Sequence, residues 1–523
     1  MDDPLTNIIN QAGQLRATGQ LGKARTLYEQ ALQADPNHPA ALVGLGIVIG
    51  RLGRPLEGIE FARRGIAAEP TNARLLVGLA DLHHLAGQCE ESLEYAKRAV
   101  DIDPTIESAH CLIANNMAQL QRVDEAVSHL AEFIGQHRDA TNAKITLAHL
   151  LIQLGRFDEA KVQLEAILGS PGLLMHFRCI AMHEMSVALD KTQKYEAAFN
   201  LHQEQGRLRL TTPEAKQFNR FSRPALIAGY TKAVNNQRIS SFKANIFSPE
   251  TEEHAPAFLV GFPRSGTTMT ELMLAAHPKI VTTGERPFLA SVRSEWAKCV
   301  GRSNDFGGMF DRLTRDQLVH LRRHYWTEVR KVFDTADWAP ETLLVDKSPL
   351  NIIDLGLINA VFPDSKIIIA LRDPRDVCIS CLFRDFRLSN ATIHLLTIED
   401  ISEFYSQVMD LYLHLREVLS LSMIENRYED TIRDPDGVAR RLIAHLNLDW
   451  NARTLAFYER GKEQNVTAAS FSSAGRPIDE RAVARWKNYE AQLQSILPNL
   501  QPYIDAFGYA RDDLVADSNS RHE

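Results

Sequence analysis

A loop with a glycine at each end carries the first residues whose types and spacing could do chemistry. Residues 261–268 read GFPRSGTT, between a short apolar run at 257–261 and the helix-like stretch MTELMLAAH. Such a loop points several backbone N–H groups, and the positive end of the helix dipole, at one spot. Arg264 adds a cation to the same loop. We therefore predict that this loop binds an anion, and specifically a phosphate.

The glycine spacing is that of a Walker A loop, but Thr267 occupies the lysine position of that motif. Without that lysine and an evident Mg²⁺ partner, ATP chemistry loses its usual charge compensation, and Arg264 is the cation that remains. A purely structural glycine turn is the alternative. It would explain the glycines but not the Arg264-Ser265 and Thr267-Thr268 pairs.

Charged residues also follow three further predicted strands. Glu285 follows VTTG, Lys347 follows the run at 342–345, and Arg372 follows the run at 366–371. In open α/β folds, ligands bind at the carboxyl edge of the strands, so we expect these side chains to meet there. Capping of the next helix is the alternative role for Glu285.

A second anion site is predicted around Arg372. Ser380 lies eight residues after it and Arg384 four further on, so that one helix face can present a hydroxyl and a guanidinium together. Guanidinium groups match the geometry of phosphate oxygens. A solvated charge run is the alternative interpretation of RDPRD at 372–376.

The elements that must position these residues alternate along the second half of the chain. Short apolar runs separated by helical stretches predict buried strands of a parallel sheet. We therefore predict a three-layer α/β/α, P-loop-like domain over residues 256–511. Polar residues predominate at 211–255, which we predict to be a linker or lid, and residues 512–523 are expected to form a disordered tail.

The first half of the chain repeats with a period of 34 residues. One register holds Gly19, Gly53, Gly87 and Gly155 with Gln121 in the remaining place, and small residues keep the same step at positions 24, 58, 92, 126 and 160. Acid-proline pairs at 35–36, 69–70 and 103–104 stop a helix once per period. Each unit is expected to be a pair of amphipathic helices, which resembles the tetratricopeptide (TPR) repeat. We predict an all-α TPR superhelix over residues 5–210, with an offset register near Tyr195.

Length, charge and cysteine content limit the remaining possibilities. A chain of 523 residues predicts about two to four domains, and a net charge of -8 gives no basic field for nucleic acid. No apolar run approaches the roughly 18–20 residues that span a bilayer, so we expect a cytoplasmic protein without a membrane span. The six cysteines form no disulfide framework, and Cys378 and Cys381 lack the second pair of a structural zinc site. Buried free thiols are expected.

Taken together, the motifs resemble a known family. The segments GFPRSGTT, AAHP, GE at Glu285, DKSP around Lys347, LRDPRDVCIS, RYED at Tyr428 and ARW at Trp486 look like the sulfotransferases that use 3′-phosphoadenosine-5′-phosphosulfate (PAPS). The chain is most similar to the protein-tyrosine sulfotransferase branch and to bacterial proteins that join TPR repeats to such a domain. The resemblance covers roughly residues 256–510.

The resemblance implies a role for each matched position. It implies that the 5′-phosphosulfate of PAPS is held by Arg264, Ser265, Gly266, Thr267 and Thr268. It implies that Arg372 and Ser380 hold the 3′-phosphate, with Arg384 close by, and that Tyr428, Ser470 and Arg485 contact the nucleotide. Glu285 falls at the position of the catalytic base, while Lys347 and Ser470 fall at positions that stabilise the transition state. The product would be adenosine 3′,5′-bisphosphate, and no metal is expected.

The acceptor and the partners are less constrained than the donor. Arg286-Pro287 follow Glu285 where the tyrosylprotein enzymes carry a second acid and a threonine, so the acceptor could be a protein tyrosine, a glycan or a small molecule. A TPR stack offers a concave surface that usually binds a peptide or another subunit, although it could pack only against its own C-terminal domain. A TPR adaptor with a non-catalytic nucleotide-binding domain and a P-loop kinase are the alternative functions.

Overall fold

The computed structural model describes residues 4–235, 254–301, 303, 305–336, 338–456 and 482–510. The chain divides into two compact units, residues 1–218 and 219–523. Ser470 and the predicted tail at 512–523 lie outside the described residues. Within the ranges that are described, no helix is both long enough and apolar enough to cross a membrane.

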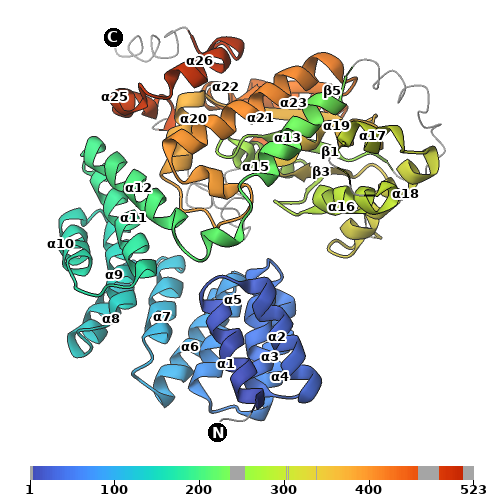
Figure 1. The fold of residues 1–523 in the computed structure, drawn as a ribbon. Coiled ribbons are helices and arrows are strands. Elements are labelled where there is room, and N and C mark those ends of the chain that lie inside the picture. The colour runs from blue at the N-terminus through green and yellow to red at the C-terminus, as the bar shows by residue number, and fades with distance from the viewer. Residues whose placement is uncertain are drawn as a thin grey trace. The chain divides into compact units, whose positions relative to one another are not determined.

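The described part of the first unit is a series of six helical hairpins, drawn from blue to green in Figure 1. The paired helices are α1 (Pro4–Ala17) with α2 (Leu21–Ala34), α3 (Pro39–Arg51) with α4 (Pro55–Ala68), α5 (Ala73–Leu85) with α6 (Cys89–Ile102), α7 (Glu107–Gln119) with α8 (Val123–Gln136), α9 (Thr141–Gln153) with α10 (Phe157–Leu168), and α11 (Met175–Lys191) with α12 (Tyr195–Leu210). A short 3-10 helix, η1 (Ala215–Gln217), follows. The predicted helical repeats are confirmed.

The repeated residues of the first unit have the physical roles that their spacing predicts. The turn within each hairpin has a left-handed residue, and Gln121 adopts this conformation at φ 64° although it is not glycine. The small residues on the same step are buried where paired helices approach: an added Cβ on Gly58 would lie 2.4 Å from the Gly46 carbonyl oxygen. In the offset hairpin, the left-handed turn residue is Gln193.

The second unit is built on five parallel strands in the order β2-β3-β1-β4-β5. Their bounds are β1 (Ala257–Gly261), β2 (Ile280–Thr282), β3 (Leu343–Lys347), β4 (Lys366–Leu371) and β5 (Ser422–Arg427). Pairing of Leu259 with both Lys347 and Ile368 fixes the register of the three central strands. All the carboxyl ends therefore lie at one edge of the sheet, as predicted, although β5 itself was not predicted.

Alternate side chains of the central strand β1 pack against different helices. Ala257 and Leu259 share a core cluster with apolar residues of α15 (Thr267–Ala275) and α23 (Pro435–His445). Phe258, on the opposite face, packs against Tyr325 of α18 (Arg315–Arg330), with ring centroids 6.3 Å apart. This alternation follows from the two-residue period of a strand. The predicted α/β class with helices on both faces is confirmed.

The remaining described elements of this unit are helical. They are α13 (Ser222–Ala233), α16 (Phe288–Val300), α17 (Phe306–Asp311), η2 (Pro349–Asp354), α19 (Leu355–Val361), α20 (Pro374–Leu382), η3 (Thr392–Leu395), α21 (Ile398–Val418), α22 (Tyr428–Arg433), η4 (Ala452–Ala456), η7 (Arg485–Tyr489), α25 (Glu490–Leu493) and α26 (Leu497–Ala506).

Helix α13 lies within the stretch that we predicted to be a linker or lid. It packs against α17 and α21 in the second unit. Its Tyr230 is fully buried and donates a hydrogen bond of 2.8 Å to Asp354 Oδ1. At least this part of the segment is therefore a packed element of the second unit.

Candidate functional site

The glycine-rich loop joins β1 to α15 at the carboxyl edge of the sheet. Gly261 must be glycine because a Cβ there would lie 2.5 Å from the Ala370 carbonyl oxygen of the neighbouring strand. Gly266 is the N-cap of α15 in the left-handed region, at φ 92°, and offers no side chain to the first-turn amides of that helix. Arg264 also has a positive φ, 71°. Backbone strain of this kind is concentrated at ligand-binding loops.

The two predicted anion sites meet at this loop. Arg264 Nε donates a hydrogen bond of 3.1 Å to Ser380 Oγ of α20. Arg372, directly after β4, donates from Nη1 to the Arg264 carbonyl oxygen at 3.2 Å. Because β1 and β4 are neighbouring strands, their carboxyl ends bring these residues together. Tyr428 completes the contact: its ring lies 4.9 Å from the Arg372 guanidinium and beside Gly266.

The electrostatics of this cluster favour an anion. The pKa of Arg264 is lowered to about 10, chiefly by burial; Cys381 opposes this change, and the nearby Arg384 and Arg372 guanidinium groups add to it. Within the described residues, the Nε atoms of Arg372 and Arg384 are buried without a hydrogen-bond partner. Buried cations of this kind are stabilised by charge-assisted hydrogen bonds to an anion. The arrangement therefore has the donors and charge that a phosphate group needs.

A C-terminal segment covers the Arg372 side of the cluster. Arg372 Nη2 donates to the Ala482 carbonyl oxygen at 2.5 Å, and the Trp486 amide donates to Asp376 Oδ1 at 2.8 Å. Burial raises the pKa of Asp376 to about 6, although Arg372 opposes the change. Arg485, predicted to contact the nucleotide, lies over the Phe383 ring at 4.8 Å. It is thus next to α20, whereas Ser470 falls outside the described residues.

One local expectation for this cluster is wrong. Helix α20 ends at Leu382, so Arg384 lies beyond the helix and does not share one of its faces with Ser380. The last turn tightens, because the Arg384 amide donates to the Cys381 carbonyl oxygen, three residues back, at 3.1 Å. Arg384 nevertheless remains near enough to lower the pKa of Arg264.

A second group of charges surrounds Lys347 at the end of β3. Lys347 is fully buried, and its Nζ lies 2.9 Å from Glu285 Oε1 and 3.0 Å from Glu271 Oε2. Burial alone would lower the pKa of Lys347, but the two carboxylates outweigh it and raise the pKa. Lys347 therefore stays a cation at neutral pH. The Glu285 side chain is 49% exposed, so it faces both the buried lysine and solvent.

Glu271 is a site residue that sequence reasoning missed. It lies on α15, is 6% exposed, and accepts a hydrogen bond of 3.1 Å from the Gly284 amide. It therefore connects the helix that follows the glycine-rich loop to the turn that carries Glu285. The sequence did contain a signal for Glu271, because it is the one charged residue in the apolar stretch MTELMLAA. A charge buried in such a helix requires a partner.

Comparisons with known proteins agree with this architecture. Residues 256–452 match the sulfotransferase family, and tetratricopeptide repeats match residues 11–73, 50–105 and 117–170. The chain therefore combines a sulfotransferase-family domain with TPR repeats. Protein-tyrosine sulfotransferase 1 of Danio rerio is 25% identical over 287 residues, covering 50% of this chain and 77% of that protein. Protein-tyrosine sulfotransferase A of Caenorhabditis elegans is 23% identical, covering 50% of this chain and 71% of that protein.

Other similar proteins cover different parts of the chain. An uncharacterized protein of Aquifex aeolicus is 25% identical over 343 residues; the match takes in 65% of this chain but spans only 43% of that protein's length. Among solved structures, a thermophilic TPR protein of Thermus thermophilus is 23% identical with a TM-score of 0.32, covering 35% of this chain and 98% of its own.

Proposed function

We propose that the second unit transfers a sulfuryl group from PAPS to an acceptor hydroxyl. The observation that supports this proposal is the contact of Arg264 with Ser380 and Arg372, which places the residues of the two predicted anion sites side by side at one sheet edge. A nucleotide with phosphate groups at both its 3′ and 5′ positions needs two such sites. The sulfotransferase-family match at residues 256–452, and relatives named protein-tyrosine sulfotransferases, support the same reaction class.

The residues present fit PAPS as the donor. The loop from Arg264 to Thr268 and the first turn of α15 offer backbone amides and a helix N-terminus for the 5′-phosphosulfate. The buried Nε of Arg372, together with the Ser380 hydroxyl, offers donors for the 3′-phosphate. Tyr428 and Arg485 lie beside these groups and would contact the nucleotide. Bound PAPS would supply an activated sulfuryl group, whose transfer requires alignment and charge stabilisation.

Glu285 is proposed to be the general base. One carboxylate oxygen is held by Lys347, which fixes the side chain, while half of the side chain is open to an acceptor from solvent. In this position Glu285 would accept the proton of the acceptor hydroxyl as its oxygen becomes the nucleophile. A general base of this kind typically contributes about 10²- to 10⁴-fold to the rate.

Lys347 and Arg264 are proposed to neutralise the negative charge that develops during transfer. Lys347 remains protonated although it is buried, because Glu271 and Glu285 raise its pKa. Arg264, with a pKa of about 10, is also a cation at neutral pH. Preorganised charges cost no rearrangement at the moment of reaction, which is why they are effective. For Ser470 we propose the role that the family resemblance implies, which is to contact the nucleotide and stabilise the transition state.

Protein tyrosine is the first acceptor to test, because the relatives at 22–25% identity include several protein-tyrosine sulfotransferases. The TPR hairpins of the first unit are proposed to bind a protein or peptide, which would suit a protein acceptor. If the acceptor is a glycan or a small molecule, we expect the TPR surface to bind a partner other than the acceptor. The fold of the donor site does not encode the acceptor.

The test is transfer of label from ³⁵S-PAPS. The full chain is incubated with labelled PAPS and a lysate from its own source, and protein, glycan and lipid fractions are counted. We expect label to enter one fraction, and Glu285→Ala to reduce incorporation by at least about 10²-fold while PAPS binding persists. Glu341→Ala is the matched control, because that acid is exposed and 3.9 Å from Lys279. Full turnover by Glu285→Ala with normal PAPS binding would refute its role as the base.

A further inference from the structure

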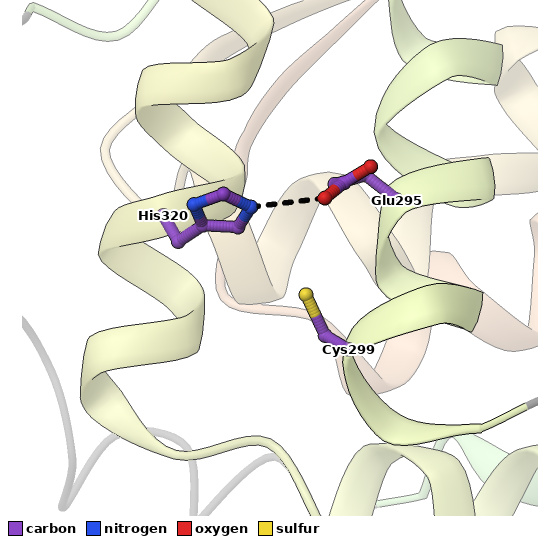
Figure 2. Close-up of side chains that lie close together, drawn as sticks. All are labelled: Glu295, Cys299 and His320. Carbon is purple, nitrogen blue, oxygen red and sulfur yellow. Dashed lines mark hydrogen bonds and ion pairs between the residues drawn. The ribbon is translucent and has the colours of Figure 1, made fainter.

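A cluster of metal-ligand types lies between two helices, apart from the charges at the sheet edge. Glu295 and Cys299 are one turn apart on α16, and His320 is on α18. One ligand atom from each of these three side chains lies within 4.8 Å of the other two. Figure 2 shows the His320 ring facing Glu295, with the Cys299 sulfur directed toward the same space between the helices. We propose that Glu295, Cys299 and His320 bind a zinc ion.

The chemistry of the three side chains selects zinc. A thiolate, an imidazole and a carboxylate together match the ligand set of Zn²⁺, and a thiolate disfavours Mg²⁺ and Ca²⁺. Bond lengths of about 2.0–2.3 Å place ligand atoms of a tetrahedral site about 3.4 Å apart. His320 Nε2 and Glu295 Oε1 are already 3.1 Å apart. All three ligand atoms lie within 4.8 Å of one another, so metal binding would have to draw them together by at most about 1.4 Å.

The surroundings orient two of the ligands. Lys298 Nζ holds the other carboxylate oxygen of Glu295 at 2.8 Å, which leaves Oε1 directed at His320. Gln317 of α18 donates to the Cys299 carbonyl oxygen at 3.2 Å, so the end of α16 is tied to the start of α18 next to the thiol. Outer contacts that fix first ligands are typical of metal sites. Solvent would supply the fourth ligand, because His324, one turn after His320, already pairs its Nε2 with Ser291 Oγ at 2.8 Å.

Cys299 also differs from the other cysteines of the chain. All six cysteines lie in described residues, and Cys299 is the one that is not buried. Cys378 and Cys381, the close pair in the sequence, are both fully buried. No zinc motif marks the cluster in the sequence, because its ligands come from two helices and combine three residue types. The proposal is independent of the sulfuryl-transfer function.

The consequence of binding would be a cross-link between α16 and α18. Helix α16 begins at Phe288, three residues after Glu285, so a metal that pins this helix would also restrict the turn that carries the proposed base. Binding to the folded chain alone would stabilise it in proportion to the logarithm of the free metal concentration. We therefore expect the metal to affect the stability of the second unit and the position of α16.

The test uses Co²⁺ as a spectroscopic probe and Zn²⁺ as its competitor. Untagged, metal-free full chain is titrated with Co²⁺ while absorbance is recorded. We expect one ion per chain, a cobalt–thiolate charge-transfer band, its loss on addition of Zn²⁺, and a higher melting temperature with Zn²⁺. Cys299→Ser should abolish the band, and His320→Gln should weaken affinity by at least about tenfold, the lower end of what even an outer contact contributes.

Controls separate metal binding from loss of fold. Glu328→Gln, which removes a partly exposed acid of α18 outside the cluster, should bind Co²⁺ like the wild type. Lys298→Ala should weaken Co²⁺ binding, because it removes the contact that orients the Glu295 carboxylate. Circular dichroism of each variant verifies the fold. No uptake of Co²⁺ by the wild type, or an unchanged band in Cys299→Ser, would show that Glu295 and His320 form an ordinary ion pair and would overturn the proposal.

Discussion

Asp346, the residue before the buried lysine, gives a quantitative test of the environment at the sheet edge. It is fully buried, and Tyr325 donates a hydrogen bond of 2.9 Å to its Oδ2. Burial raises the pKa of Asp346 from 3.8 to about 7, although the hydrogen bonds from Tyr325 and Thr283 oppose the change. The perturbation is Asp346→Asn, which keeps the shape and an acceptor but removes the titration.

The size and sign of the effect follow from the two pKa values. The interval from 3.8 to about 7 corresponds to about 4 kcal/mol at 1.36 kcal/mol for each pKa unit. Between these values the folded state binds more protons than the unfolded state, so stability falls as pH rises. The contribution of Asp346 is complete below its unfolded pKa and is lost as pH approaches 7. Between pH 5 and 7 the stability of the wild type relative to the variant should fall by about 2–3 kcal/mol.

Tryptophan fluorescence can follow the unfolding of the second unit, which contains Asp346. The five tryptophans are at positions 296, 326, 338, 450 and 486, all in the second unit. Urea unfolding of wild type and Asp346→Asn at pH 5, 6, 7 and 8 gives the difference in unfolding free energy at each pH. Other titrating groups cancel in that difference. A difference that does not change between pH 5 and 7 would refute the reasoning, because Asp346 would then titrate alike in both states.

Two further predictions concern the site. Glu271→Gln should reduce the transfer rate and move the alkaline limb of the pH–rate profile to lower pH, because Glu271 helps to raise the pKa of Lys347. An alkaline limb at the same pH as in the wild type would contradict this prediction. Gly266→Ala should weaken nucleotide binding by about tenfold or more, measured by titration calorimetry, because the position has φ 92° and a Cβ would lie 2.7 Å from Tyr428. Gly301→Ala, at φ 77° with nothing within 4 Å of the added Cβ, is the matched control and should bind normally. Equal losses in both variants would show that backbone strain alone is responsible.

Much of the fold was predictable because its signals are local or periodic. The step from Gly19 to Gly155 marks turns that need a left-handed residue, and the bounds expected for β1 and β4 are those observed. β5 was missed because its SMIENR sequence is half-polar: this outer strand is only partly buried, so it lacks a continuous apolar run. Helix α13 was missed because its buried Tyr230 depends on tertiary partners rather than on a helical period.

The site was predictable at strand ends and less so within helices. Arg264, Lys347 and Arg372 were found because parallel strands deliver their ends to one edge. Glu271 was missed because its role depends on Lys347, a partner 76 positions later that only folding brings near. The position of Arg384 depended on where α20 ends, which spacing alone does not determine.

Binding of adenosine 3′,5′-bisphosphate tests the central claim most directly. Titration calorimetry of the full chain should show one binding site without added metal, and Arg372→Ala should weaken binding by about 10- to 100-fold, because it removes charge-assisted hydrogen bonds. Arg433→Ala, an exposed arginine paired with Asp430, should bind like the wild type. No binding of this nucleotide, or tighter binding of ATP with Mg²⁺, would contradict the account.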